Sequence, residues 1–128
     1  MKITKQDIEE INAICPFYEQ GIFVQPNGIP TDVKEPVIYM RWTVGGRQGG
    51  SCWRTPTHER EAEDKPKFKA LDLVLKRIKP DITFLQYREI EELVHTNEET
   101  DREYYGNSTD YKIEYIILSE LEALLEKL

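Results

Sequence analysis

The chain has 128 residues, of which 39% are apolar and 32% are charged, and its formal net charge is −7. This length is typical of a single domain, residues 1–128, whose core needs neither a metal nor disulfides. The longest apolar run, 115–118, is too short for a transmembrane helix, and residues 1–20 lack the pattern of a secretory signal, so no membrane association is expected. Cys15 and Cys52 are too few for a disulfide scaffold, and we expect a reducing, cytoplasmic location.

The first predicted element is a helix over residues 5–15. Thr4 and Asp7 have the spacing of a capping box, which supplies an oxygen for a free backbone amide and an acid in the first turn. The apolar residues after them recur at helical spacing: Ile8, Ile11, Ile14 and Cys15. Pro16 ends this helix, and a short strand over 21–25 follows before a group of turn residues.

The clearest strand covers residues 37–44, which are rich in β-branched and aromatic side chains. Because side chains alternate along a strand, one face is apolar and should be buried: Ile38, Met40, Trp42 and Val44. The opposite face carries Val37, Tyr39, Arg41 and Thr43. The glycine-rich segment 45–50 and the extended residues 51–54 come next, and together they predict a β-hairpin.

The second half of the chain predicts three more helices and a strand. An exposed polar loop over 54–63 precedes Asp64, which we expect to cap a helix that ends before Pro80 and has this apolar stripe: Phe68, Leu71, Val74, Leu75 and Ile78. Pro66 is tolerated in the first turn of that helix. Thr83 begins a second capping pattern, which opens a helix over 85–94.

The last part of the chain predicts a polar loop, a strand and a helix. The loop covers residues 97–107, and a strand over 110–117 follows with an alternating face of Tyr111, Ile113, Tyr115 and Ile117. Ser119 is expected to cap a final helix whose leucines face inward. The sequence therefore predicts an α+β fold: a small antiparallel sheet with a Gly-rich hairpin, packed on one face by three to four helices.

Charge is segregated along the chain. Residues 36–58 contain no acid, and their cations are all arginine: Arg41, Arg47 and Arg54. Residues 65–79 are basic, whereas 89–103 carry seven acids against Arg102. This alternation produces either solvated faces that keep the protein in solution or an acidic surface that meets a basic partner. An acidic chain lacks the basic face that duplexes require, so direct binding to duplex DNA is not expected.

The hairpin over residues 41–54 is the most informative stretch for function. Its glycine amides can approach an anion closely, arginine grips phosphate or carboxylate, and tryptophan and arginine are enriched at interfaces. Trp42 shares the apolar strand face and is expected in the core, whereas the candidate partner-binding residues of the hairpin are Arg47, Gln48, Trp53 and Arg54. The spacing matches neither a Walker loop nor the dinucleotide-binding fingerprint.

Three further patterns in the sequence bear on function. Residues 49–53 repeat part of the papain-type nucleophile pattern, but Pro56 interrupts the helix that should follow, and the available bases are His58 and His95. The alternative is that Cys52 is a half-buried strand residue acting as a small apolar side chain. No short-spaced zinc ligands occur, so neither a metal nor a cofactor is expected. The remaining candidate partner contacts are Tyr104 and Tyr105 and the acids Glu91, Glu92, Glu98, Glu99 and Asp101.

Three segments together resemble a group of small bacteriophage and mobile-element accessory proteins. They are Gly45-Gly46-x-x-Gly49-Gly50-x-Cys52-Trp53, Phe84-Leu85-Gln86-Tyr87, and Tyr104-Tyr105-Gly106-Asn107-x-Thr109-Asp110-Tyr111. The resemblance covers roughly residues 35–125. It implies a short, acidic viral protein in the host cytoplasm that inhibits host defence, a class that includes anti-CRISPR proteins. It carries no catalytic residue over to this chain.

These observations support three hypotheses. The first is a non-enzymatic protein that binds a host protein or nucleoprotein, with Arg47 and Trp53 as anchors and the acids of 89–103 facing a basic groove. The second is a small-ligand protein that binds or sequesters a nucleotide through arginines and backbone amides. The third is a hydrolase that uses Cys52. A homo-oligomer is compatible with all three.

Overall fold

The protein is described from a computed structural model, which describes residues 2–15, 19–48, 51–53, 65–102 and 108–128. Its helices are α1 (Lys5–Ile14), α3 (Lys69–Ile78), α4 (Phe84–Glu91) and α5 (Leu118–Lys127). Its strands are β1 (Gln20–Val24), β2 (Pro36–Gln48), β3 (Ser51–Trp53), β4 (His95–Arg102) and β5 (Ser108–Ile117). The strands form one antiparallel sheet in the order β1-β2-β5-β4, with β3 paired to the end of β2. The predicted α+β class is confirmed.

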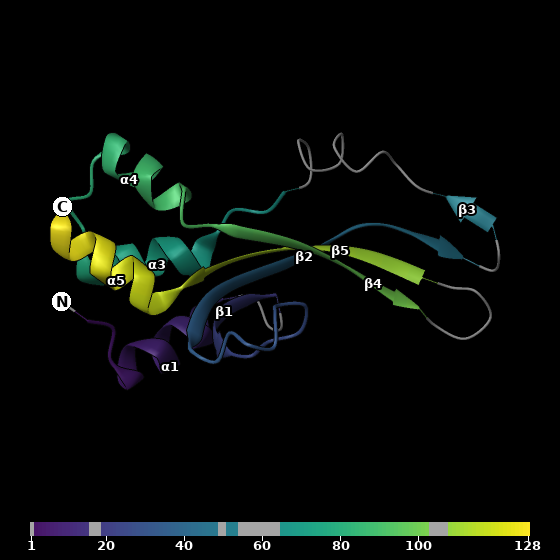
Figure 1. Ribbon diagram of the computed structural model, residues 1–128, viewed down its shortest axis with the longest axis horizontal. Coiled ribbons are helices and arrows are strands. Elements are labelled where there is room, and N and C mark those ends of the chain that lie inside the picture. The colour runs from purple at the N-terminus through teal and green to yellow at the C-terminus, as the bar shows by residue number, and fades with distance from the viewer. Residues whose placement is uncertain (1, 16–18, 49–50, 54–64, 103–107) are drawn as a thin grey trace.

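The sheet is longer than the layer of helices that covers it. The helices gather at one end, near both ends of the chain, and the far ends of β2, β4 and β5 continue past them together with β3 (Figure 1). We call this projecting part the arm and define it by residues that lie abreast in the register: 42–48, 51–53, 98–102 and 108–112. A β-bulge between Thr43 and Gly45 breaks the β2–β5 register there, and a bulge increases the local twist of a sheet.

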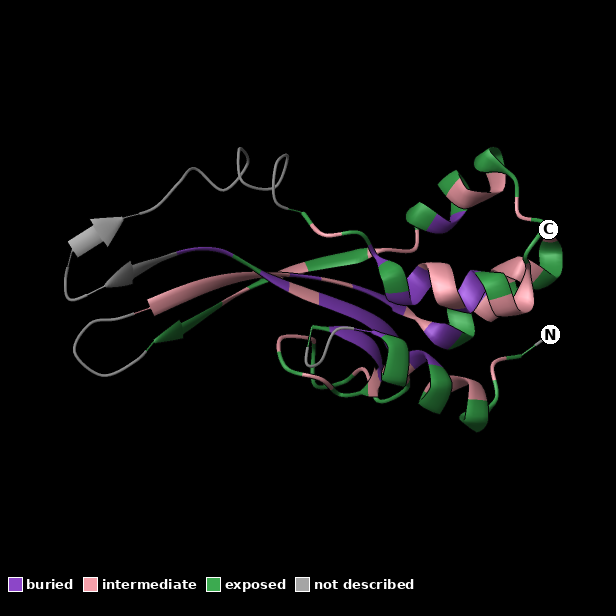
Figure 2. Cartoon of the chain, turned by 180° about the vertical axis from the view of Figure 1, so that it is seen from behind, coloured by how far each residue is buried: buried purple, intermediate pink, exposed green. Residues whose placement is uncertain are grey.

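The main core lies between one face of the sheet and the helices, as predicted. Ile38, Met40 and Trp42 of β2 are buried against apolar residues of the helices: Ile11 of α1, Leu71 and Val74 of α3, Ile90 of α4 and Leu121 of α5 (Figure 2). Arg77 of α3 adds two ion pairs to α1, with its Nη1 atom 3.1 Å from Asp7 and 2.7 Å from Glu10. The helices therefore pack on one face of the sheet.

The opposite face of the sheet is also buried, which alternation in the strand did not predict. Val37 and Tyr39 of β2 pack with Ile113 and Tyr115 of β5 in a second, smaller core. The β1–β2 connection, residues 25–35, covers them, and two bonds join it to β2 and β4: the Tyr39 hydroxyl donates to the Asn27 carbonyl at 2.7 Å, and the Asn97 amide donates to the Gly28 carbonyl at 3.0 Å. This face of the sheet is therefore covered by a loop, whereas the other face is covered by the helices.

Local signals placed some element boundaries correctly and others wrongly. The capping boxes at Thr4 and Thr83 are present as predicted. The predicted cap Asp64 is wrong, because α3 begins at Lys69, after Pro66, and its Ala70 amide donates to the side chain of Gln20 at 3.0 Å. The predicted cap Ser119 is also wrong, since it lies inside α5 and its hydroxyl donates to Glu35 at 2.7 Å.

Two polar side chains, Gln20 and Asn12, form hydrogen bonds with backbone groups of segments that are distant in the sequence. Gln20 is buried, and its amide also donates to the Lys67 carbonyl at 2.7 Å. Asn12 of α1 pairs with both backbone groups of Ile22, since it donates to the carbonyl at 3.1 Å and accepts from the amide at 2.8 Å. These bonds satisfy backbone groups that burial would otherwise leave unpaired, a loss that costs about 1–3 kcal/mol each.

Tyr39, one of the two buried tyrosines of the second core, contributes to the response of the protein to alkaline pH. Burial raises the pKa of Tyr39 to about 12 from 10.0 in the free side chain, against a smaller lowering by Arg41. Because the folded pKa is the higher one, the stabilisation is complete below pH 10 and is lost as the pH rises toward 12. Two pH units correspond to about 2–3 kcal/mol of unfolding free energy.

We expect Tyr39→Phe to remove this part of the pH dependence, although the variant also loses the bond to Asn27. Chemical denaturation at pH values between 9 and 12 measures it, with tyrosinate absorbance as a second readout. Parallel decline of both proteins over that range would contradict the assignment.

Candidate partner-binding surface

Strand β4 is an acidic strand at the edge of the sheet. Its residues 97–102 were predicted to be loop, and this prediction is wrong, because all of β4 pairs with β5. Among the described residues, no strand pairs with its outer edge. Three of the predicted partner contacts lie on it: Glu98, Glu99 and Asp101. An open edge offers a row of backbone donors and acceptors that a strand of another protein can pair with.

The three carboxylates of β4 point to alternate faces and meet cations of the sheet. Glu98 lies 2.9 Å from the Lys112 ammonium. On the opposite face, Glu99 and Asp101 lie 2.9 and 3.1 Å from the Arg41 guanidinium, which also stacks 3.7 Å from the centre of the Tyr111 ring. Glu98 and Asp101 remain 70% and 50% exposed. The strand therefore presents carboxylates to solvent while their cations lie behind them.

This arrangement bears on the nucleotide hypothesis. Arg41 belongs to the acid-free segment whose arginines were expected near an anion, but in the structure it is engaged by two carboxylates and an aromatic ring. A phosphate at Arg41 would have to displace both acids, and a net gain is then small because repulsion from them remains. The described residues thus offer little support for a phosphate site at this arginine.

The end of α4 adds negative charge next to the start of β4. Glu91 is the last residue of the helix and Glu92 is its C-cap, and both are exposed. In the described part of the chain neither has a cation within ion-pair distance. The first turn of the same helix exposes an apolar pair, since Phe84 and Leu85 are 75% and 74% accessible.

The hairpin candidates are only partly visible. The backbone of Arg47 and Gln48 pairs with β3, and Gly46 lies opposite Trp53. The side chains of Arg47, Gln48 and Trp53 lie outside the described part of the structure, as do the turn residues 49–50, so the Gly-rich hairpin and its contacts stay predictions. Arg54, Tyr104 and Tyr105 also lie outside the described residues. Trp42 is buried, as predicted.

The register separates Cys52 from one of its two candidate bases. Cys52 lies opposite Arg47, which pairs with Ser108, and Ser108 pairs with Arg102 at one end of β4. His95 is at the other end of β4 and stacks on Tyr115, with 4.9 Å between ring centres. Seven residues of extended strand span about 23 Å. His95 therefore cannot activate Cys52, and His58 lies outside the described residues.

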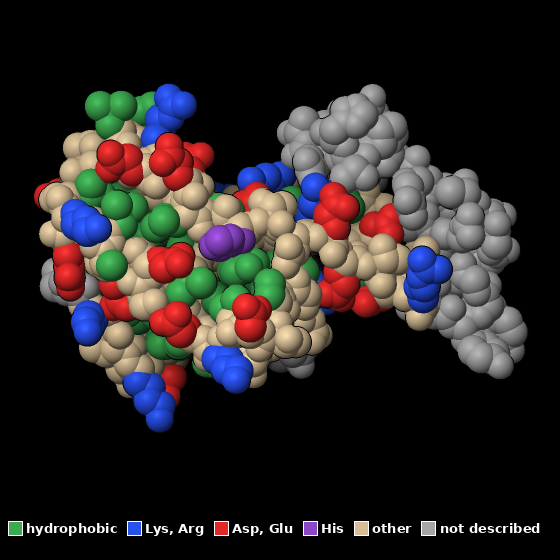
Figure 3. Space-filling model, in the orientation of Figure 1, with side chains coloured by type: hydrophobic (Ala, Val, Ile, Leu, Met, Phe, Trp, Pro, Cys, Tyr) green, Lys and Arg blue, Asp and Glu red, His purple; other side chains and the backbone are tan. Residues whose placement is uncertain are grey.

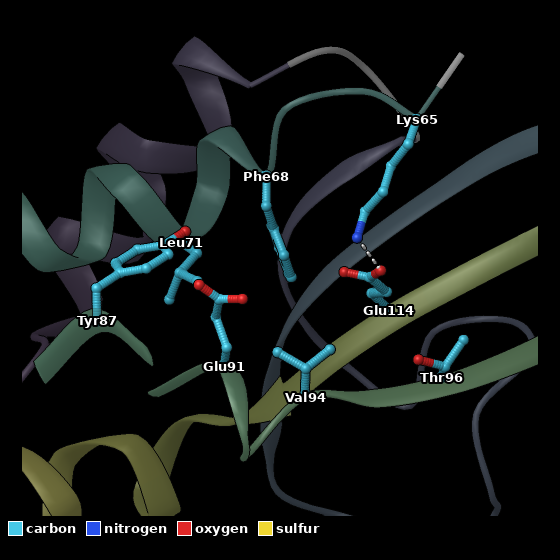
Figure 4. A pocket seen from close by; sticks show the side chains of 8 residues that line it. All are labelled: Lys65, Phe68, Leu71, Tyr87, Glu91, Val94, Thr96 and Glu114. Carbon is cyan, nitrogen blue, oxygen red and sulfur yellow. Dashed lines mark ion pairs between the residues drawn. The ribbon is translucent and has the colours of Figure 1, made fainter. Parts of the chain in front are cut away.

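A cavity of about 430 Å³ opens on the helix-covered face, where α3 and α4 meet β4 and β5. Its lining is Lys65, Phe68, Leu71, Tyr87, Glu91, Val94, Thr96 and Glu114 (Figure 4). Figure 3 shows the surface hollowed beside α4. The Lys65 ammonium reaches Glu114 at 2.5 Å.

Comparisons of the chain with known proteins gave no match. No family model, no curated protein and no solved structure matches the chain. In the described residues, no group of three or more His, Cys, Asp or Glu side chains is positioned to hold a metal ion, and none of the helices has the length and hydropathy to cross a bilayer.

Of the cavity residues, only Glu91 was a sequence candidate. A second cavity residue, Glu114, could have been found from the sequence. Alternation along the strand places it on the face opposite Ile113 and Tyr115, which is the face that the helices cover. A carboxylate on a covered face needs a compensating partner. Phe68 carried no such signal, since its spacing only predicted a core position.

Proposed function

We propose that the protein is a non-enzymatic binding protein that recognises a basic surface of a partner protein through β4 and the adjoining end of α4. The observation that carries this proposal is the open, acidic edge of β4 on a projecting arm. Charged edge strands resist pairing with neutral strands, so an acidic edge favours a partner of opposite charge. The resemblance to phage accessory proteins makes a host defence protein or nucleoprotein the expected partner, and inhibition the expected result.

Charge neutralisation tests this surface. We expect the variant Glu92→Gln/Glu98→Gln/Asp101→Asn to lower the amount of partner captured from a bacterial lysate by about 10-fold or more, the loss expected for about 1.4 kcal/mol of binding free energy. Asp101 can be neutralised because Arg41 keeps Glu99 as an ion-pair partner. The readout is quantitative mass spectrometry of proteins retained by the immobilised chain at two salt concentrations.

A matched control has the same change in net charge elsewhere. Glu9 of α1 and Glu120 and Glu126 of α5 are exposed acids on the helical end, and their triple Gln variant should retain the partner within about two-fold, as expected for changes outside an interface. Equal loss in both variants would mean a non-specific charge effect, and no loss in either would exclude this surface. The pair Arg47→Ala/Trp53→Ala, which should also weaken binding without unfolding the domain, tests the hairpin separately.

A further inference from the structure

The cavity where α3 and α4 meet β4 and β5 joins an apolar floor to an excess of negative charge. Phe68, Leu71 and Val94 are apolar, whereas Glu91 and Glu114 contribute two carboxylates against the single ammonium of Lys65. Glu114 is the more buried of the ion pair, with 13% of its side chain exposed compared with 45% for Lys65. A site of this composition repels anions and favours a ligand with an apolar stem and a cationic head.

The chain itself shows that a cationic head fits there. Lys65 extends into the cavity from above α3 and places its ammonium on Glu114, 6.0 Å from the centre of the Trp42 ring (Figure 4). Glu91 approaches from the other side, from α4, and its carboxylate lies between Tyr87 and Phe68 (Figure 4). Among the described residues, Glu91 has no cation of its own, so one of the two carboxylates is open to an incoming charge.

The electrostatic environment of Tyr87 agrees with this charge excess. Burial raises the pKa of the Tyr87 hydroxyl, and the carboxylates of Asp72, Glu91 and Glu114 raise that pKa further. All three carboxylates act in the same direction, so the electrostatic potential that they produce at the Tyr87 hydroxyl is negative.

We infer that this cavity binds the side chain of an arginine from the partner protein, an inference that rests on the proposed function. A guanidinium stacks on aromatic rings and donates two parallel hydrogen bonds to a carboxylate, so Phe68, Tyr87 and Glu91 together match it better than they match an ammonium. Thr96 links the cavity directly to β4, because it lines the cavity and belongs to that strand. A partner strand beside β4 therefore lies within reach of the cavity.

The test uses a small probe in place of the partner. Nα-acetyl-L-arginine methylamide is titrated into the full chain, and backbone amide shifts are followed by NMR. The neutral isostere Nα-acetyl-L-citrulline methylamide is the control ligand. We expect saturable shifts at Tyr87, Val94 and Thr96 with the arginine probe alone, at an affinity on the order of millimolar, the range open to a single side chain.

Two variants of α4 decide whether Glu91 is the carboxylate that binds. Glu91→Gln should lower the affinity for the arginine probe at least five-fold. Glu89 is an exposed acid of the same helix outside the cavity lining, and Glu89→Gln should leave that affinity within two-fold. The inference is overturned if the arginine probe gives no saturable shift, if the citrulline probe binds equally well, or if the two variants behave alike.

The outcome separates this inference from the proposed function, because the partner-capture variant leaves Glu91 unchanged. If the arginine probe does not bind but the capture variant loses the partner, the arginine site is excluded and the proposed binding surface is retained. If the probe binds but the capture variant retains the partner, the cavity is an arginine site and the proposed binding surface is excluded.

Discussion

Gly28→Ala should destabilise the protein by about 2–5 kcal/mol, the sum of a left-handed backbone cost and of overpacking. Gly28 has φ +88°, a conformation that residues with a Cβ atom rarely adopt. A Cβ built there would also stand 2.5 Å from a carboxylate oxygen of Glu99 and collide with the tip of the Ile113 side chain. Since Ile113 is fully buried in the second core, it has little room to move.

The effect should extend beyond the loop. The Gly28 carbonyl accepts the bond from Asn97 of β4, so a shifted loop also loosens the edge strand and the ion pairs of Arg41. Urea denaturation measures the stability, and hydrogen exchange of the β4 amides reports the local effect. Asn27→Ala, at the exposed neighbouring position, is the control and should change stability by less than about 0.5 kcal/mol. A Gly28→Ala protein as stable as this control would contradict the close approach.

The second large effect is expected in α1, where two isoleucines with the same helical spacing have different environments. Ile11→Ala should cost about 2–5 kcal/mol, because the residue is completely buried in the main core and its loss leaves a cavity. Ile14→Ala should cost less than about 0.5 kcal/mol, since Ile14 is 50% exposed.

Both substitutions replace the same side chain in the same helix, and helix propensity changes by less than about 1 kcal/mol at either position, so most of the difference between them reports burial. Thermal or urea unfolding of the two variants, measured side by side, gives that difference. Equal costs would mean that α1 does not dock on the sheet by the face containing Ile11.

These two isoleucines also show how much of the fold a sequence pattern can predict. Helical spacing placed Ile11 and Ile14 on one stripe, but the pattern carries no information on how wide the covered stripe is. The capping boxes at Thr4 and Thr83 were predictable because every atom involved belongs to four consecutive residues. The start of α3 was not, because its amide partner Gln20 lies 50 residues away in the chain.

Strand β4 was missed for a related reason. Its sequence, His-Thr-Asn-Glu-Glu-Thr-Asp-Arg, has no apolar residue and is typical of a loop. It becomes a strand because β5 provides the backbone partner, and because Arg41 and Lys112 offset the repulsion between its acids. The cavity shares this property, since its lining comes from α3, α4, β4, β5 and the segments that precede α3 and β4, and no single segment carries its pattern.

The position of the two chain ends has a practical consequence for immobilisation. Both ends lie with the helices, opposite the arm (Figure 1), and the Ile3 amide donates to Glu122 of α5 at 3.0 Å. A biotin, dye or resin linker attached at either terminus is thereby kept remote from β4. Sensor chips prepared through one terminus or the other should report the same association kinetics.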